Sequence, residues 1–311
     1  MGFSIRAPMR PGRRQTAGNV MIMGGSVLPP AITVAVVGLD ATITNTGGAA
    51  ASVDWGDGTV NASLTHTYTV GGVPRTVTAT GPGGSSAVTI IPNDVPMLLI
   101  AQSRAAGLLY QDAGKTVPAV DDGDPIRVAT CPVTGVDYVA PSSAARPTLY
   151  DSGSGKWAAT FDGVDDQLGA TPSWSGSNGS QATAFVRTSG TTVQVVQHRV
   201  AATGADYYAF AGAAYAQNFR VNRLNNYGSP PVDTNPHTYC NISGADYRVY
   251  VDGTQLGSTV AADWQVPSQI TIAGADLAFF TGRVTASVWS KVAWDATQRA
   301  ATLAYIAGLN A

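Results

Sequence analysis

The chain has 311 residues, of which only 12% are charged, and its formal net charge at pH 7 is −2. A charge so close to zero offers no overall attraction for nucleic acid or for an anionic membrane, so neither is expected as a partner. The sequence contains no glutamate, and every acidic side chain is therefore an aspartate. Any mechanism that needs a glutamate nucleophile or a glutamate acid is excluded.

The composition is rich in Gly, Ala, Ser and Thr, which favours β-sandwiches with short turns, and the length allows two domains. No apolar stretch reaches the ~18 residues of a membrane-spanning helix, and the N-terminus lacks the apolar core of a secretory signal. Two cysteines, Cys131 and Cys240, are too few for a disulfide framework, and whether they pair is left open.

Residues 1–30 contain four arginines and four prolines but no acidic residue. Such a segment cannot bury a core of its own. One interpretation is a disordered tail, and the other is a docking arm that becomes ordered on an acidic partner surface. We predict the docking arm, and its arginines are Arg6, Arg10, Arg13 and Arg14.

From Ala31 onward apolar residues alternate with polar ones, which is typical of β-strands. Strands are expected over 32–37, 41–45, 75–80 and 86–91. Prolines and small polar residues over 92–96 then indicate a linker. The first domain is therefore expected to cover residues 31–94, a usual size for a small sandwich.

Inside this domain, Trp55 is followed by the turn sequence Gly56-Asp57-Gly58, and His66 and Tyr68 come shortly afterwards. Glycines accept the positive φ angles that a tight turn needs. We expect the strand of His66 and Tyr68 to lie beside the strand that Trp55 ends. The pattern resembles the polycystic kidney disease (PKD) repeat, an immunoglobulin-like β-sandwich that serves as a spacer or adhesion unit. Trp55, Asp57, His66 and Tyr68 are accordingly expected to be structural.

The remainder, residues 95–311, is a second β-rich unit, with strands expected over 182–187, 191–198, 207–210, 219–224, 247–251, 269–273 and 279–289. One short helix follows them. Asp295 is its expected N-cap, with Gln298 at N3 and Gly308 at C′. The expected apolar face of this helix consists of Ala300, Leu303, Ala304 and Ala307.

Several motifs follow one another along this unit, each occurring once: Tyr110-Gln111-Asp112-Ala113, Arg146-Pro147, Phe161-Asp162-Gly163-Val164-Asp165-Asp166, Tyr250-Val251-Asp252-Gly253, and the final strand and helix. As a set they resemble a laminin-G/concanavalin A-like jelly roll, variants of which are frequent in bacteriophage and prophage structural proteins. The expected fold class is all-β: a small immunoglobulin-like β-sandwich and a larger concanavalin A-like jelly-roll sandwich with a short C-terminal helix.

Catalysis is not expected, and no catalytic residue is assigned. Glycosidases on the concanavalin-like scaffold use two glutamates, which this chain lacks. The only histidines are His66, His198 and His237, and no Gly-x-Ser-x-Gly motif marks a nucleophile. The sequence therefore predicts a protein that is not an enzyme.

Two aspartate clusters are candidate calcium sites, because laminin-G-like domains often hold calcium at the rim of the sandwich. The first consists of Asp121, Asp122 and Asp124, and the second of Asp162, Asp165 and Asp166. The alternative is that these aspartates cap the backbone of ordinary turns. No other cofactor is expected.

Glycan binding needs an aromatic ring for stacking beside amide or carboxylate groups. The candidate residues are Trp174, Arg223, Asn225, Asn226 and Tyr227. The alternative is that Trp174 and Tyr227 fold back onto the sandwich. The aromatic residues that alternate within strands are expected in the core, namely Phe161, Phe185, Tyr250 and Trp289.

Together these features predict a non-enzymatic surface protein of a bacteriophage virion, either a head decoration protein or a head fibre. The alternatives are a tail-associated adhesin and a secreted bacterial carbohydrate-binding protein. The expected partners are a viral capsid or tail protein, a cell-surface glycan and further copies of the chain. The expected location is the virion surface, after assembly in the host cytoplasm, or alternatively the extracellular space.

Overall fold

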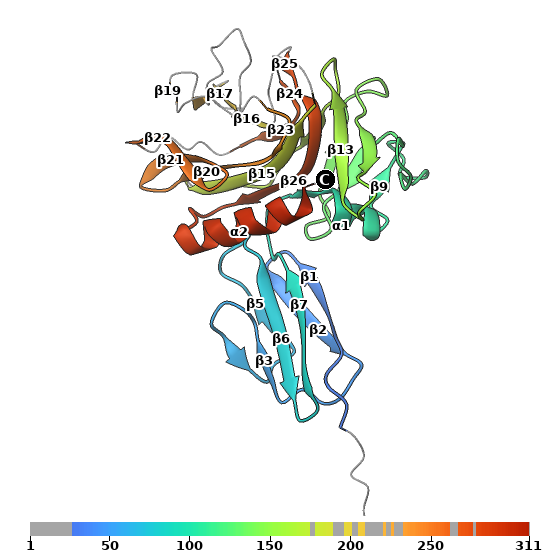
Figure 1. Ribbon diagram of the computed structural model, residues 1–311, viewed down its shortest axis with the longest axis vertical. Coiled ribbons are helices and arrows are strands. Elements are labelled where there is room, and N and C mark those ends of the chain that lie inside the picture. Colours follow the sequence, from blue (N-terminus) through green and yellow to red (C-terminus); the bar gives the residue numbers. More distant parts are fainter. Residues whose placement is uncertain are drawn as a thin grey trace, which may run out of the picture.

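The computed structural model describes residues 27–174, 178–188, 196–200, 205–208, 220–221, 225–226, 233–261, 267–275 and 278–310. Within these ranges the regular structure is nearly all antiparallel β, with two helices (Figure 1). The expected all-β fold class with a short C-terminal helix is confirmed. No helix in the described part of the chain has the length and apolar character needed to span a bilayer.

The small sandwich consists of two antiparallel sheets. One has the order β1-β2-β5 and the other the order β4-β3-β6-β7. Their strands are β1 (Ile32–Val37), β2 (Asp40–Asn45), β3 (Ser52–Asp54), β4 (Val60–Asn61), β5 (Thr65–Thr67), β6 (Arg75–Gly81) and β7 (Gly84–Ile90). Trp55 and Tyr68 are buried between the sheets together with apolar residues from both, such as Ile43 and Val77.

The predicted position of the strand that carries His66 is wrong. β5 pairs with β2, whereas β3, which Trp55 follows, pairs with β4 and β6 in the opposite sheet. His66 therefore faces Trp55 across the sandwich, with the two rings stacked at 5.1 Å between centroids. The alternation of side chains indicates which face a residue occupies, but it does not identify the partner strand.

The large sandwich also has two layers in the described residues. One sheet has the order β12-β13-β26-β15-β20-β21-β22, with β8 against β26, and the other has the order β19-β18-β17-β16-β23-β14-β11-β10-β9. The first sheet consists of β8 (Leu98–Leu99), β12 (Thr148–Asp151), β13 (Trp157–Asp162), β15 (Gly179–Arg187), β20 (Pro236–Ser243), β21 (Asp246–Val251), β22 (Thr254–Ala261) and β26 (Thr281–Ser290). The second consists of β9 (Leu109–Tyr110), β10 (Val128–Thr130), β11 (Asp137–Val139), β14 (Leu168–Ala170), β16 (Val196–Val200), β17 (Ala205–Tyr208), β18 (Arg220–Val221), β19 (Asn225–Asn226) and β23 (Gln269–Ile272). A short ribbon joins β24 (Gly274–Ala275) to β25 (Ala278–Phe279).

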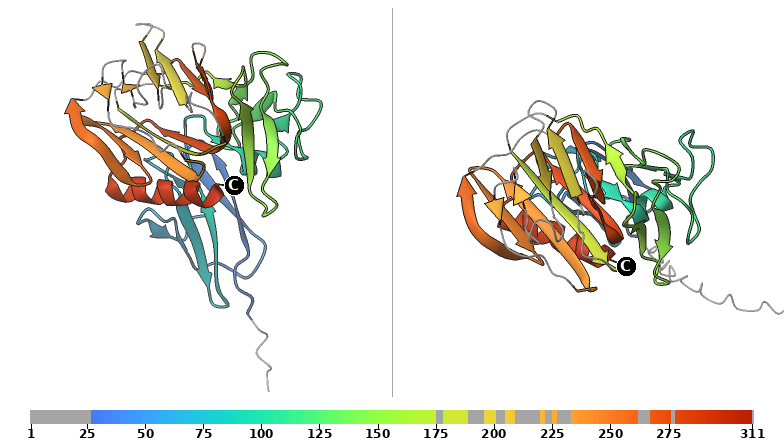
Figure 2. Two further views of the ribbon diagram at one scale, coloured as in Figure 1. Left: turned by 45° about the horizontal axis from the view of Figure 1, so that its top comes forward. Right: turned by 90° about the horizontal axis from the view of Figure 1, so that it is seen from above.

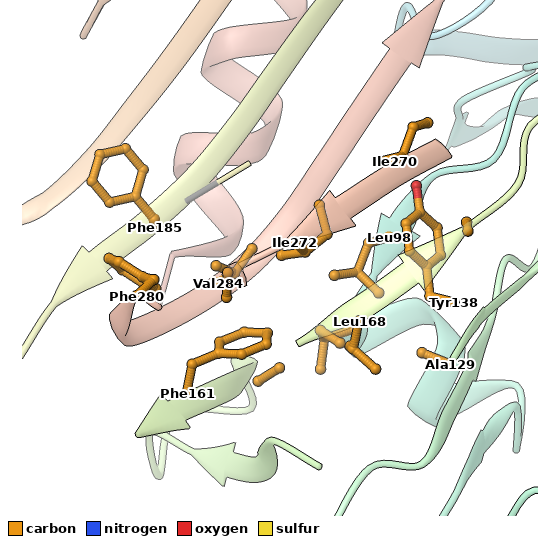
Figure 3. Packing of buried hydrophobic residues seen from close by; sticks show 14 of the residues in the cluster. Leu98, Ala129, Tyr138, Phe161, Leu168, Phe185, Ile270, Ile272, Phe280 and Val284 are labelled. Carbon is orange, nitrogen blue, oxygen red and sulfur yellow. The ribbon is translucent and has the colours of Figure 1, made fainter. Parts of the chain in front are cut away.

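The main core lies between these two sheets (Figure 3). Phe161, Phe185 and Val284 come from one sheet, and Leu168 and Ile272 come from the other. The expectation that Phe161, Phe185 and Trp289 are core residues is confirmed, since each is at most 1% exposed.

The outer face of the β15 sheet is covered as well, by α2 (Ala296–Leu309) and by one end of the small sandwich (Figures 1 and 2). A second core cluster fills this contact, and Tyr250, another expected core residue, belongs to it. The free thiols of Cys131 and Cys240 are buried in the same cluster and form no disulfide with each other. Because both of its faces are covered, β15 is buried along its whole length.

The capping box of α2 is present as expected: the Asp295 carboxylate accepts from the Gln298 backbone N–H, and the Gln298 side chain accepts from the Asp295 N–H. The C-terminal end differs, because Gly308 lies inside the helix and Asn310 is the C-cap. The expected apolar face is also wrong, apart from Leu303. The buried positions are Thr302, Leu303 and Ile306, while Ala300, Ala304 and Ala307 are exposed. A second short helix, α1 (Ile100–Ala105), was not expected.

The segment expected as a linker is buried instead. Pro92, Asn93 and Val95 are buried, with Asn93 0% exposed, whereas Asp94 between them is exposed. The Asn93 amide donates to the carbonyl oxygen of Trp289 at 2.6 Å, and the Trp294 indole donates to the carbonyl of Gly71 at 3.3 Å. The two sandwiches therefore share a packed interface rather than a flexible connection.

Candidate functional site

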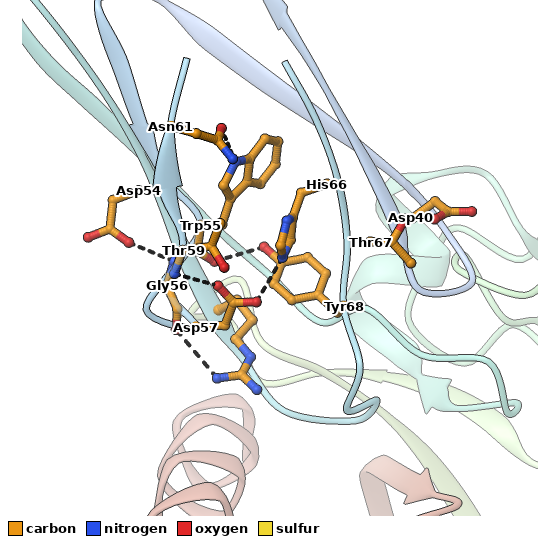
Figure 4. Close-up of polar contacts among 11 residues, drawn as sticks. Asp40, Asp54, Trp55, Gly56, Asp57, Thr59, Asn61, His66, Thr67 and Tyr68 are labelled. Atoms are coloured by element: carbon orange, nitrogen blue, oxygen red, sulfur yellow. Dashed lines mark hydrogen bonds and ion pairs between the residues drawn. The ribbon is translucent and has the colours of Figure 1, made fainter. Parts of the chain in front are cut away.

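The Gly-Asp-Gly turn is a structural unit (Figure 4). Gly56 and Gly58 both have positive φ, at 75° and 94°. The Tyr68 hydroxyl donates to the Trp55 carbonyl at 2.8 Å, and His66 Nε2 lies 2.7 Å from Asp57 Oδ2. Burial raises the pKa of Asp57, but the hydrogen bonds from Thr59 and His66 outweigh it and hold that pKa below its usual value. These contacts fasten the turn to the opposite sheet.

Several predicted site residues lie outside the described residues. They are the arm arginines Arg6, Arg10, Arg13 and Arg14, and the loop residues Arg223 and Tyr227. Asn225 and Asn226 form strand β19, of which the backbone alone is described.

The first aspartate cluster caps turns. Asp124 Oδ2 accepts hydrogen bonds from the backbone N–H groups of Val120 and Asp121, both at 2.9 Å. The carboxylate of Asp122 does not bond to the same turn and instead accepts a hydrogen bond from the backbone N–H of Asp151. The Asp124 bonds lower the pKa of that carboxyl below its ordinary value. Calcium at this cluster stays a prediction.

The second aspartate cluster converges. Asp162, Asp165 and Asp166 place carboxylate oxygens within 4.8 Å of one another, and they are the one such group among the described residues. Asp166 is 6% exposed. Burial, together with the charges of its two neighbours, raises the pKa of Asp166 to about 7 despite a hydrogen bond from the Asp162 N–H. Three hard oxygen donors at a turn are the kind of ligand that Ca²⁺ prefers.

His237, at the start of β20, is held between two carboxylates. Its Nδ1 lies 2.7 Å from Asp252 and its Nε2 lies 2.9 Å from Asp233. Because both ring nitrogens are engaged, the ring is not available as a general base for a nucleophile. A groove of about 420 Å³ opens beside Asp252, lined further by Arg299, Leu303 and the exposed alanines of α2.

Trp174 folds back onto the sandwich, which was the alternative expected for it. Its ring packs edge-on against Trp289, with 6.2 Å between ring centroids, and its side chain is half-buried. Of the five predicted glycan-binding residues, Trp174 is the one whose side chain the structure describes.

Beside this tryptophan pair lies a group of buried polar side chains that the sequence did not reveal. Gln181 pairs across strands with Trp289 on one side and with Asn241 on the other. Thr183 pairs in the same way with Ser287, so all these side chains share the inner face of the sheet. We call this group the inner polar cluster: Gln181, Thr183, Asn241, Ser243 and Ser287, each at most 3% exposed.

Hydrogen bonds connect most of the inner polar cluster. Gln181 Nε2 donates to Thr183 Oγ1 at 3.2 Å, and Thr183 Oγ1 lies 2.9 Å from Ser287 Oγ. Asn241 Nδ2 donates to Gln181 Oε1 at 3.2 Å. Amide and hydroxyl groups of this kind, placed beside an aromatic pair, can bind the hydroxyl groups and the apolar face of a sugar.

No family model matches the chain, and no curated protein matches it. Among solved structures it is similar to Trypanosoma rangeli sialidase, with 11% identity, a TM-score of 0.41, and coverage of 86% of this chain and 47% of that one. It is also similar to domain 4 of AbnA, a GH43 extracellular arabinanase from Geobacillus stearothermophilus in complex with arabinotriose (12% identity, TM-score 0.34, 50% of this chain and 81% of that one). A third similar structure is that of botulinum neurotoxin type C, a toxin whose cell entry is described as dependent upon interaction with two ganglioside molecules (9% identity, TM-score 0.38, 60% of this chain and 51% of that one). The chain spans about half the length of the sialidase that it matches, and these likenesses concern the β-rich fold alone.

Proposed function

We propose that this chain is a non-enzymatic surface protein of a bacteriophage virion, a head decoration protein or head fibre, whose large sandwich binds glycans. The N-terminal arm would dock on a capsid protein, the small sandwich would act as a stalk, and the large sandwich would face outward. The observation that carries the proposal is that the end of the arm and the large sandwich contact opposite ends of the small sandwich.

The two ends of the small sandwich have different neighbours. The backbone of Leu28, near the end of the arm (residues 1–30), lies directly against Gly83 in the β6–β7 turn. At the opposite end Gly38 donates to the carbonyl of Val133, and Gly72 packs against Trp289. The described end of the arm, residues 27–30, and the large sandwich are therefore at opposite ends of the small one (Figure 1), as a docked and projecting protein requires.

Glycan binding is supported by the contacts around Trp174. The half-buried ring of Trp174 packs against Trp289. Gln181, which carries an amide, is the cross-strand neighbour of Trp289. Binding through such a site is weak for a single copy, and many copies on one particle would multiply its strength.

The proposal that the chain is not an enzyme is supported by its chemistry. No glutamate is present to serve as the acid or nucleophile of a retaining glycosidase. His237 is occupied by Asp233 and Asp252.

The docking half of the proposal is tested by deleting residues 1–26, which precede the residues that contact the small sandwich, and measuring attachment of the purified chain to particles. We expect attachment to be lost while circular dichroism and the melting temperature stay unchanged. Full attachment of the shortened chain would contradict docking by the arm. Attachment to tail structures instead of heads would favour the tail adhesin.

The binding half is tested on a glycan array, with release of reducing sugar measured in parallel. Trp174→Ala is expected to weaken binding. Trp157→Ala is the matched control, because Trp157 is also half-buried against the main core. Release of sugar would contradict the non-enzymatic assignment, and equal binding by both variants would remove Trp174 from the site.

A further inference from the structure

We infer that the inner polar cluster is the floor of a binding site for an uncharged saccharide, entered beside the β20–β21 turn. This inference rests on the proposed function and places its glycan-binding half in a definite site. Three observations support it: two buried polar atoms without a partner, a surface turn that follows directly after one of them, and the absence of charge in the cluster.

The first observation is incomplete hydrogen bonding in the interior. Asn241 is 3% exposed and uses Nδ2 to bond Gln181, yet its Oδ1 has no hydrogen-bond partner. Ser243 is 0% exposed, and its Oγ also has no partner. Protein interiors pair nearly all buried polar atoms, because an unpaired one is costly. Hydroxyl groups of a bound ligand would supply hydrogen-bond partners for Asn241 Oδ1 and Ser243 Oγ.

The two unpaired atoms belong to one strand and one face. Asn241 and Ser243 are two residues apart on β20, so their side chains are about 6–7 Å apart and point the same way. A single sugar ring carries hydroxyl groups on opposite edges and can reach both residues. The third polar neighbour, Gln181, lies directly opposite Asn241 on β15.

The second observation is the position of Ser243, which is buried but is the last residue of β20. It directly precedes the β20–β21 turn, in which Ala245 is exposed. The residue opposite Ser243 is Gly179, which carries no side chain. The cluster therefore runs inward from a surface turn, through Ser243 and Asn241, to Gln181.

Two aromatic side chains, Trp174 and Trp289, lie beside the inner polar cluster. Trp289 is the cross-strand neighbour of Gln181, and the half-buried Trp174 packs edge-on against it. Sugars present a face of C–H groups that stacks on aromatic rings, while their hydroxyl groups bond to amides. The pair of tryptophans and the pair of amides together match this mixed surface.

The third observation concerns charge. The five side chains of the inner polar cluster and the two tryptophans are all uncharged. Arg187 also belongs to β15, but it is six residues from Gln181 and therefore about 20 Å away along the strand. An acidic sugar would bring an unpaired carboxylate into this interior, which is unfavourable. The site is thus expected to prefer neutral sugars.

The test uses the full chain with a panel of galactose, glucose, mannose, N-acetylglucosamine, lactose and 3′-sialyllactose. Melting temperature and tryptophan fluorescence report binding. At least one neutral sugar is expected to raise the melting temperature and change the fluorescence, and 3′-sialyllactose is expected to bind no more tightly than lactose.

Two variants locate the site. Ser243→Ala removes an atom that has no partner, so we expect the unliganded protein to melt at an unchanged or higher temperature while sugar affinity falls about tenfold. Asn241→Leu is expected to abolish binding. Ser103→Ala is the matched control: its buried hydroxyl donates to the carbonyl of Thr130, so this change is expected to lower the melting temperature and leave sugar affinity unchanged.

Sugar binding that survives both Ser243→Ala and Asn241→Leu would overturn this site but leave the proposed glycan-binding function standing. Tighter binding of 3′-sialyllactose than of lactose would overturn the preference for neutral ligands. No response to any sugar on the panel would overturn both the site and the glycan-binding half of the proposed function.

Discussion

The amide of Asn93 donates a 2.6 Å hydrogen bond to the carbonyl oxygen of Trp289, and this bond joins the small sandwich to the large one. Trp289 thereby takes part in two contacts at once. Its backbone anchors the small sandwich on the outer side of the sheet, and its side chain faces Gln181 and Trp174 on the inner side. The interface and the candidate site share one strand, β26.

The buried Asn93 contact predicts that the two sandwiches unfold together. Asn93→Ala would leave the Trp289 carbonyl without its partner and is expected to lower the free energy of unfolding by about 1–3 kcal/mol. Calorimetry of the full chain should show one transition, because the second core cluster contains residues of both sandwiches.

The neighbouring ion pair supplies a control for this prediction. Asp94 lies 2.9 Å from Lys291, but both side chains are partly exposed. Asp94→Ala is therefore expected to cost less than about 1 kcal/mol. Two separate transitions in the wild-type chain, or equal effects of the two variants, would contradict a shared buried interface.

The Trp55 turn makes a prediction about the small sandwich. Trp55 is 0% exposed, and Trp55→Ala is expected to destabilise the full chain by about 3–5 kcal/mol. Asp57→Ala removes bonds to Thr59 and His66 near the surface and is expected to cost about 1–2 kcal/mol. Urea unfolding measures both, and an unchanged midpoint for Trp55→Ala would mean that the ring is not in the core.

The sequence predicts local features of this fold well. The glycine turn after Trp55 and the capping box of Asp295 depend on neighbouring residues alone, and both are present. Burial of the segment around Asn93 was not predictable in this way. Proline and small polar residues indicate a turn, but contact with another sheet decides whether that turn is exposed.

The inner polar cluster was missed for a related reason. In β15 the polar Gln181 and Thr183 alternate with Ala182 and Ala184, and such a pattern normally indicates polar side chains in solvent. Here the alanine face lies under α2 and the small sandwich, and the polar face lies inside. A strand covered on both faces carries no sequence signal for which face is the interior.

His237 predicts a dependence of stability on pH. Burial lowers its pKa, but the hydrogen bonds to Asp252 and Asp233 outweigh burial and raise the pKa above 6.5. The stabilisation by the protonated ring is therefore fully present below pH 6.5 and is lost as pH rises through the raised pKa. His237→Gln is expected to lower the melting temperature clearly at about pH 6 and much less at about pH 9.

The control for this variant is Asp137→Asn, which removes an ion pair with Lys115 in which no histidine takes part. Its effect on the melting temperature should be the same at both pH values. An equal loss for His237→Gln at both pH values would show that the ring acts by packing alone.

The convergent aspartates predict a response to calcium. If Asp162, Asp165 and Asp166 bind Ca²⁺, free calcium at about a hundred times its Kd should stabilise the chain by about 2.7 kcal/mol. Asp165→Asn combined with Asp166→Asn should abolish this shift, whereas Asp122→Asn in the first cluster should not. A melting temperature that does not respond to calcium would assign the cluster to capping of its turn.

The central claim is that this chain belongs to the surface of a phage particle, and electron microscopy of the native particles tests it most directly. Particles would be labelled with an antibody against the large sandwich, with particles that lack the gene as the control. We expect label on the outer surface of the head, with density for the small sandwich between the capsid shell and the large sandwich. Absence of the chain from purified particles, with the protein found free in the medium, would contradict the claim and favour a secreted carbohydrate-binding protein.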